Sequence, residues 1–285
     1  MKTIKEILSL STDYLTKHNC PSPRLEAEWL ISHALGLTRM DLYMQHDRPL
    51  DEDELGKIRP MLDRRGKHEP VQYICGSTEF YGIEIHCGPG VLIPRPETER
   101  LVDLALEKVE GKVRILDVCT GTACIALALA KELPDAEIIA IDLSPEALKY
   151  AQKNKDFHKL DNVTLLQGDL FAPLATQEPF DLIVSNPPYV TEEEYVSLDS
   201  EVKAFEPQSA LTAPNAGLEI LYRLAVEAKD LLKPGAYLLC EMGIEQGPAT
   251  SEFFAQHGYE DVQVVQDYTS RDRIISGRKK VFSIK

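Results

Sequence analysis

Apolar residues recur at helical spacing through the first 69 positions of the chain. The first stripe consists of Ile4, Ile7, Leu8, Tyr14 and Leu15. A period of about 3.6 residues predicts an amphipathic helix. A Ser-Pro start and a terminating glycine predict a second helix over 22–36, and shorter helices are expected over 38–46 and 51–66. Residues 1–69 are therefore predicted to form a small helical bundle, either a structural cap or a domain that docks a partner.

The pattern changes after residue 69. Residues 71–74 and 80–85 are rich in β-branched and aromatic side chains and are joined through Gly76-Ser77, which predicts two paired strands. We therefore predict a β-hairpin linker over residues 70–95.

From about residue 96, short apolar runs alternate with helical patterns. Strands are predicted at 113–118, 136–141, 163–166, 180–185, 236–241, 260–265 and 273–284. Helices are predicted at 121–132, 145–156, 218–232 and 245–257. Such alternation predicts a mostly parallel sheet with helices on both faces, and the last two strands are expected to pair as an antiparallel hairpin. Residues 96–285 are thus predicted to form an α/β domain with a Rossmann-like, seven-stranded sheet.

Composition indicates the class of protein and the compartment in which we expect it. Of the 285 residues, 44% are hydrophobic and 27% are charged, as in a globular chain with a core. No apolar run approaches the roughly 20 residues that cross a bilayer, and the start lacks the apolar block of a signal peptide. We therefore expect a cytoplasmic protein that has no membrane partner. The six cysteines form no CxxC pair and lie near no His cluster, so no metal site is expected.

The net charge of −15 lies almost entirely after residue 70. An acidic domain repels a phosphate backbone. The charge therefore disfavours direct binding of an extended nucleic acid.

Three predicted strand ends carry small or acidic residues. Asp117 opens a loop of small residues that runs to Ala123, between a strand and a helix. Asp142 ends the next strand, and Asp169-Leu170 follows the third. Ligands bind at the carboxyl ends of parallel strands, where acids accept hydrogen bonds from ribose and base. Together the three ends favour a nucleoside cofactor.

Asn186-Pro187-Pro188-Tyr189 directly follows the fourth strand. Two prolines cannot continue a central strand, so they fix a rigid, extended loop at its end. The Asn186 side-chain carbonyl and the Pro187 backbone carbonyl are then two acceptors that can hold both hydrogens of a planar NH₂ group. Tyr189 can stack on that group. The motif therefore predicts a site for an amide or an aromatic amine.

The chain resembles a known family over nearly its whole length. Beyond the Asn-Pro-Pro-Tyr motif, the segments that carry the resemblance are 70–74, 79–82, 91–99, 180–190, Glu201-Val202, Glu206-Pro207 and Asp272-Arg273. They are similar to the HemK/PrmC family of release-factor glutamine N5-methyltransferases, which are class I S-adenosylmethionine-dependent methyltransferases. The resemblance implies methyl transfer to the glutamine of the Gly-Gly-Gln motif in class I peptide-chain release factors, hence a role in translation termination. It further implies S-adenosylhomocysteine as product and no metal, and we expect a monomer.

The resemblance also implies roles for individual residues. The methionine part of the cofactor would be held by Cys119, Thr120, Gly121, Thr122 and Ala123. Asp142 would bind the ribose, and Asp169 and Leu170 would flank the adenine. The segment containing Arg95, Glu97 and Thr98 would cover the cofactor. The substrate glutamine would be bound by Asn186, Pro187, Pro188 and Tyr189, with Asn186 and Pro187 catalytic and Asn186 also touching the cofactor.

Three positions depart from the family pattern. Cys119 and Ala123 stand where family loops often have glycine, and Leu170 stands where some relatives have an aromatic residue. The Ala123 methyl group matters if the backbone there adopts a positive φ or touches the cofactor. These departures bear on cofactor affinity more than on the type of reaction.

Other functions stay open at this point. An adenine-N6 nucleic-acid methyltransferase needs the same grip on an NH₂ group, but it must also hold phosphates. A related subfamily methylates a ribosomal-protein glutamine. A scaffold that binds cofactor without catalysis would need the Ala123 departure to be disabling.

Overall fold

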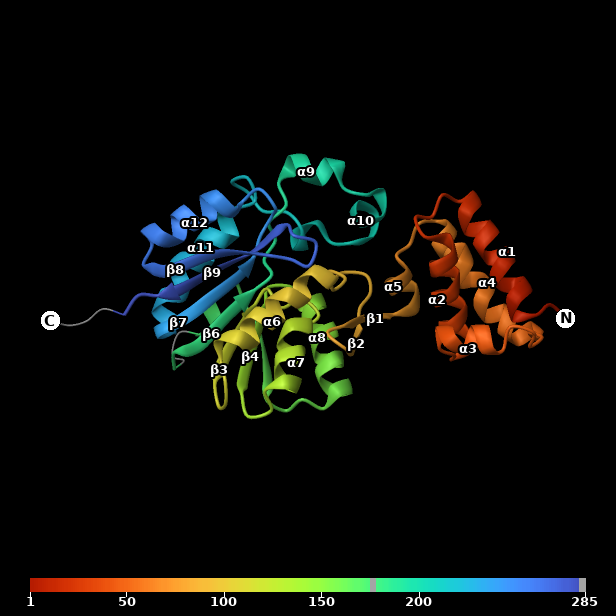
Figure 1. Cartoon of the computed structure of the whole chain (residues 1–285), viewed down its shortest axis with the longest axis horizontal. Helices are drawn as coiled ribbons and strands as arrows, with labels where there is room; N and C mark the ends of the chain where they lie inside the picture. The colour runs from red at the N-terminus through yellow and green to blue at the C-terminus, as the bar shows by residue number, and fades with distance from the viewer. Residues whose placement is uncertain (175–177, 282–285) are drawn as a thin grey trace. The chain divides into compact units, whose positions relative to one another are not determined.

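The computed structural model describes residues 1–174 and 178–281 (Figure 1). The chain divides into two compact units, Met1–Ser77 and Thr78–Lys285. Among the described residues, no helix has both the length and the apolar character needed to cross a membrane.

The first unit is helical. Its helices are α1 (Ile4–Lys17), α2 (Pro23–Leu35), α3 (Arg39–Met44), α4 (Glu52–Gly66) and α5 (Val71–Cys75). Thr3, Thr38 and Asp51 each begin a helix with a capping box, in which their side chain accepts from a backbone N–H three residues on. The four helices predicted before residue 67 are confirmed, and apolar residues of α1, α2 and α4 form one core.

The strand predicted at residues 71–74 is wrong, because this segment is helix α5. Pro70, with φ −55°, precedes the helix, and the Ile74 N–H donates to the Pro70 carbonyl at 3.0 Å. Gly76 ends the helix in the left-handed conformation. A short apolar run fits a strand and a buried helical turn equally well. The hairpin forms later, from β1 (Ser77–Phe80) and β2 (Ile83–His86).

The turn between β1 and β2 occupies positions that had been predicted as strand. Tyr81 and Gly82 both have positive φ, at 49° and 68°. Two such residues make the hairpin turn whose twist matches that of the strands. The Tyr81-Gly82 pair therefore forms the hairpin turn, although it lies within an apolar run.

The second unit contains the predicted seven-stranded sheet. Its strands are β3 (Arg114–Val118), β4 (Glu137–Asp142), β5 (Val163–Gln167), β6 (Phe180–Ser185), β7 (Leu232–Glu241), β8 (Tyr259–Gln266) and β9 (Asp272–Lys279). The spatial order is β5-β4-β3-β6-β7-β9-β8. Strands β3 to β7 pair in parallel, and β9 pairs antiparallel with both β7 and β8. The predicted antiparallel closure is confirmed. Strand β9 ends at Lys279, short of the predicted residue 284, and residues 282–285 lie outside the described chain.

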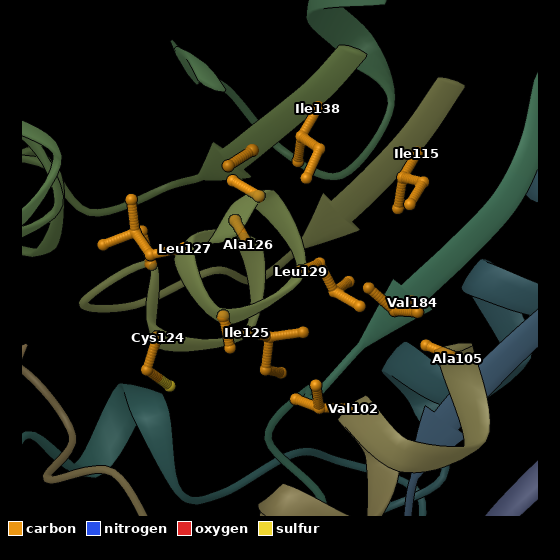
Figure 2. Packing of buried hydrophobic residues seen from close by; sticks show 14 of the residues in the cluster. Val102, Ala105, Ile115, Cys124, Ile125, Ala126, Leu127, Leu129, Ile138 and Val184 are labelled. Atoms are coloured by element: carbon orange, nitrogen blue, oxygen red, sulfur yellow. The ribbon is translucent and has the colours of Figure 1, made fainter. Parts of the chain in front are cut away.

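Helices cover both faces of the sheet, as predicted. They are α6 (Glu99–Lys108), α7 (Cys124–Glu132), α8 (Pro145–His158), α11 (Glu219–Leu231) and α12 (Gly247–Gln256). Neighbouring residues of β3 point to opposite faces, so Ile115 packs with α6 and α7 while Leu116 packs with α11. Figure 2 shows the first of these layers, where Ile125 and Leu129 of α7 lie beside Val102 of α6 and Val184 of β6. Two apolar layers thus fix the strands whose ends form the site.

Three α-helices of this unit were not predicted. Helix α6 leads into the sheet, and the short helices α9 (Glu192–Ser197) and α10 (Ser200–Phe205) follow β6. Neither α9 nor α10 buries a residue, so neither has the apolar stripe by which helices are predicted. Short 3₁₀ turns lie at Pro96–Thr98, Ala172–Leu174 and Gln208–Ala210.

Candidate functional site

A cavity of about 560 Å³ lies at the carboxyl ends of β3, β4 and β6. The chain runs from β3 outward to β5 and then returns to the other side of β3 to form β6. Loops on the two sides of β3 therefore diverge, which leaves a crevice at this edge of the sheet.

Most of the predicted site residues line this cavity. Lining residues that were predicted are Arg95, Thr98, Cys119, Thr120, Gly121, Thr122, Asp142, Asp169, Leu170, Asn186 and Pro188. Glu97, Ala123, Pro187 and Tyr189 are not among its lining residues. Two segments that line it had no assigned role, Gly90–Leu92 and residues between Pro207 and Pro214. Only the Glu206-Pro207 pair, noted in the family resemblance, pointed toward the second segment.

The loop after β3 turns three times through left-handed backbone. Cys119, Gly121 and Ala123 have φ values of 60°, 58° and 64°. Helix α7 therefore begins at Cys124, later than the predicted Gly121. The Thr120 N–H donates to the carbonyl of Ile141 at 2.9 Å, which joins this loop to the end of β4.

Ala123 meets one of the two conditions under which its methyl group matters. Its φ is positive, but it lies outside the cavity lining, and its side chain is fully buried in the apolar layer against α7. A left-handed alanine is strained by about 1 kcal/mol, and its buried methyl group offsets a similar amount.

We therefore expect Ala123→Gly to change the affinity for S-adenosylmethionine, the cofactor that the family resemblance implies, by less than about twofold, because the methyl group faces the core. Titration calorimetry measures this affinity. A gain in affinity of tenfold or more would show that the methyl group does obstruct the ligand.

Asp117 is fully buried behind the loop. Its Oδ2 accepts from the Thr120 hydroxyl at 2.5 Å and from the Ala126 N–H at 3.2 Å. Its Oδ1 has no hydrogen-bond partner within the described part of the chain. Burial, followed by the nearby Asp142 carboxylate, raises the pKa of Asp117 from 3.8 to about 7.

The raised pKa of Asp117 makes stability depend on pH. Between pH 3.8 and about 7, Asp117 is protonated in the folded chain but ionised in the unfolded chain. The stabilisation from this proton is full below pH 3.8 and is lost as pH rises through 7. We expect Asp117→Asn to flatten the fall in unfolding free energy of the ligand-free protein between about pH 5 and 8. Urea unfolding across that range measures it, and a slope equal to that of the wild type would contradict the assignment.

Asp142 holds the loop from the end of β4. Its Oδ2 accepts from the Gly121 N–H and its Oδ1 from the Ser144 N–H, both at 2.8 Å. Burial raises the pKa of Asp142, and these N–H donors oppose the shift. Each carboxylate oxygen keeps a further lone pair for a hydroxyl donor in the cavity.

Asp169 and Leu170 form the next wall. Asp169 is paired with the Arg223 guanidinium, whose two nitrogens donate at 2.9 and 3.2 Å. Leu170 is buried, with a positive φ of 46°. The pair thus combines a positioned carboxylate with an apolar surface.

Asn186 belongs to a chain of hydrogen bonds that leads away from the cavity. Its Nδ2 donates to the Thr98 hydroxyl at 3.2 Å, and that hydroxyl donates to Glu241 Oε2 at 2.6 Å. Glu241 Oε1 accepts from the Tyr189 hydroxyl at 2.8 Å. Tyr189 therefore directs its hydroxyl toward buried Glu241, which ends a predicted strand but had no predicted role.

Glu206 joins the two cavity-lining segments that had no assigned role, the one that begins at Gly90 and the one that begins at Pro207. This buried carboxylate accepts from the Ile93 N–H at 3.1 Å and from Arg95 at 2.5 Å. The loop that follows β6 pairs with the second of these segments: the Val190 N–H donates to the Leu211 carbonyl, and the Ala213 N–H donates to the Val190 carbonyl. The Glu206 carboxylate and the backbone pairing of Val190 thus hold these two segments at the carboxyl ends of the strands.

Comparisons with known proteins agree with this arrangement. Residues 6–76 match a PrmC N-terminal domain, and residues 110–269 match a methyltransferase domain. The release factor glutamine methyltransferase of Geobacter sulfurreducens is 43% identical over 277 residues, which cover 97% of this chain and 96% of the relative. The one from Vibrio cholerae is 40% identical over 282 residues, which cover 98% and 97%. A methyltransferase structure from Pyrococcus furiosus has a TM-score of 0.55 at 21% identity, covers 71% of this chain and 91% of its own, and supports the fold alone.

Proposed function

The chain belongs to the release factor glutamine methyltransferase family, and from that premise we propose that the cavity binds S-adenosylmethionine and presents a release-factor glutamine to it. The substrate we propose is the glutamine of the Gly-Gly-Gln motif. The observation that carries this proposal is the position of Asn186-Pro187-Pro188-Tyr189 at the end of β6, with Asn186 and Pro188 on the cavity wall.

The residues around the cavity suit this cofactor. The Asp142 carboxylate can accept from ribose hydroxyls, and the Asp169-Leu170 pair offers an acceptor beside an apolar face. Acidic groups at this end also favour a ligand that carries positive charge.

When bound, S-adenosylmethionine supplies an electrophilic methyl group on a positively charged sulfur. An amide nitrogen is a poor nucleophile, because its lone pair is delocalised into the carbonyl group. Asn186 Oδ1 and the Pro187 carbonyl would accept the two amide hydrogens and fix the plane of the substrate amide. They would also stabilise the positive charge that develops on nitrogen, an electrostatic contribution of a few kcal/mol.

These two acceptors remove the need for a strong base. The nitrogen becomes far more acidic as it gains the methyl group, so its proton can leave late. The chain's own contribution is therefore orientation and charge stabilisation.

The test is methyl transfer from labelled S-adenosylmethionine to a purified class I release factor and to its Gln→Ala variant in the Gly-Gly-Gln motif. We expect label on the wild-type factor only. Equal label on both would place the modification elsewhere. Label on neither, but on a ribosomal protein or on DNA, would support the ribosomal-protein or adenine-N6 alternative.

A further inference from the structure

We propose that Thr98 and Glu241 orient the side-chain amide of Asn186, so that its oxygen, rather than its nitrogen, faces the substrate amide. This inference rests on the proposed function. Thr98 and Glu241 are positioning residues in it, since both act through Asn186.

The direction of the hydrogen bonds fixes the orientation. Glu241 is 2% exposed, and each of its oxygens accepts from one hydroxyl, Oε2 from Thr98 at 2.6 Å and Oε1 from Tyr189 at 2.8 Å. A threonine hydroxyl has one proton, and that of Thr98 is used in the hydrogen bond to Glu241. The Thr98 oxygen can then only accept, so the Asn186 atom 3.2 Å away must be the NH₂ nitrogen.

The far end of the network supplies Glu241 with a second hydrogen-bond donor, the Tyr189 hydroxyl. Burial raises the pKa of Glu241, and the donors Thr98 and Tyr189 together with the Arg273 charge oppose that shift. Arg273 donates to the Tyr189 oxygen at 3.4 Å and is itself paired with Asp267. Burial and the neighbouring carboxylate raise the pKa of Tyr189, so its hydroxyl remains a donor at neutral pH.

The orientation matters because an asparagine amide has two different ends. The Pro187 backbone carbonyl cannot reverse, whereas a rotation of Asn186 by half a turn would replace its acceptor with an NH₂ group. Two NH₂ groups facing each other cannot form a hydrogen bond. The substrate amide would then lose one of the two acceptors that we assign to it.

Sheet order brings the three residues together. Ser185 of β6 is in register with Cys240 of β7, so Asn186 and Glu241 follow as neighbours on adjacent parallel strands. Thr98 is the last residue of the 3₁₀ turn before α6, and its hydroxyl lies between Asn186 and Glu241 and bonds to both. Thr98 lines the cavity, whereas Glu241 and Tyr189 do not, so the Kd of each Thr98 variant for S-adenosylmethionine separates an orienting role from a lost ligand contact.

Thr98→Val and Thr98→Ser form a matched pair for the test. Valine keeps the shape and removes the hydroxyl, while serine keeps the hydroxyl. We expect Thr98→Val to lower kcat by roughly 10- to 100-fold, which corresponds to one oriented hydrogen bond in the transition state. The KM for the release factor and the Kd for S-adenosylmethionine should change by less than about threefold, and Thr98→Ser should recover most of kcat.

Glu241→Gln tests the same network if the valine variant fails to fold. Glutamine can accept from Thr98 or donate to it, so both Asn186 orientations become populated and kcat should fall by about twofold or more. An unchanged kcat in the folded variants would overturn the proposal. A parallel loss of cofactor affinity and thermal stability in Thr98→Val, with no recovery in Thr98→Ser, would show a merely structural role and also overturn it.

Asn186→Ala, assayed alongside, separates this proposal from the proposed function. If Asn186→Ala is inactive while Thr98→Val keeps full kcat, the orienting network is wrong and the function stands. If Asn186→Ala keeps its turnover, the role of Asn186 as an acceptor for the substrate amide is wrong and the orienting role fails with it, while methylation of the release factor still stands. If the wild-type enzyme labels no release factor, the proposed function itself fails.

Discussion

Replacing Asn186 by alanine is expected to lower turnover by roughly 100- to 1,000-fold and to leave cofactor binding intact. The substitution removes one of two acceptors whose contacts strengthen as charge develops on the substrate nitrogen. The cofactor contacts that we assign to Asp142 and to the loop after β3 are unchanged by it. The effect should therefore appear in kcat and not in the Kd for S-adenosylmethionine.

Single-turnover methyl transfer and titration calorimetry measure these two quantities separately. Asn162→Ala is a suitable control, because it removes side-chain bonds to three backbone carbonyls but lies outside the cavity lining. Its turnover should stay near that of the wild type. If Asn186→Ala keeps more than about a tenth of the wild-type rate, the role assigned to Asn186 is wrong.

Asp142→Ala is expected to weaken S-adenosylmethionine binding by about 100-fold. The substitution removes the proposed acceptor for the ribose hydroxyls. It also frees the N–H groups of Gly121 and Ser144, which the carboxylate holds at 2.8 Å on either side of the cavity wall. A 100-fold change corresponds to about 2.7 kcal/mol, which lies within the range of about 1.5–3 kcal/mol that one hydrogen bond to a charged group contributes.

Calorimetry with S-adenosylmethionine measures the change in affinity. Asp181→Ala is the matched control, since Asp181 holds Arg114 and Lys233 at the other end of the strands. The control should bind the cofactor as the wild type does. An Asp142→Ala affinity within about threefold of the wild type would remove Asp142 from the cofactor site.

The elements that sequence periodicity predicted correctly are those that bury an apolar face. Helix α1 presents a helical period to one core, and strands β3 and β6 are short apolar runs buried on both faces and recognised by their alternation with helices. The segment 71–74 was misassigned because a run of apolar residues has no readable period, and its conformation depends on Pro70 and Gly76. Helices α9 and α10 escaped prediction because they bury nothing.

The cavity residues at strand ends could be predicted because parallel topology brings such ends to one edge. Asp142, Asp169 and Asn186 follow three different strands and line one cavity. Glu241 also ends a predicted strand, so the same signal was present for it, but its contact with Thr98 depends on β7 lying beside β6. The closure of the cavity by Glu206 likewise depends on contacts across more than a hundred residues.

The most direct test of the central claim is to locate the new methyl group by tandem mass spectrometry. A class I release factor would be incubated with S-adenosylmethionine and with either the wild-type enzyme or Asn186→Ala, and the peptide containing Gly-Gly-Gln would be sequenced. The account predicts a single methyl group on the side-chain nitrogen of that glutamine with the wild-type enzyme, and almost none with Asn186→Ala. A methyl group on another residue, or equal methylation by the two enzymes, would contradict it.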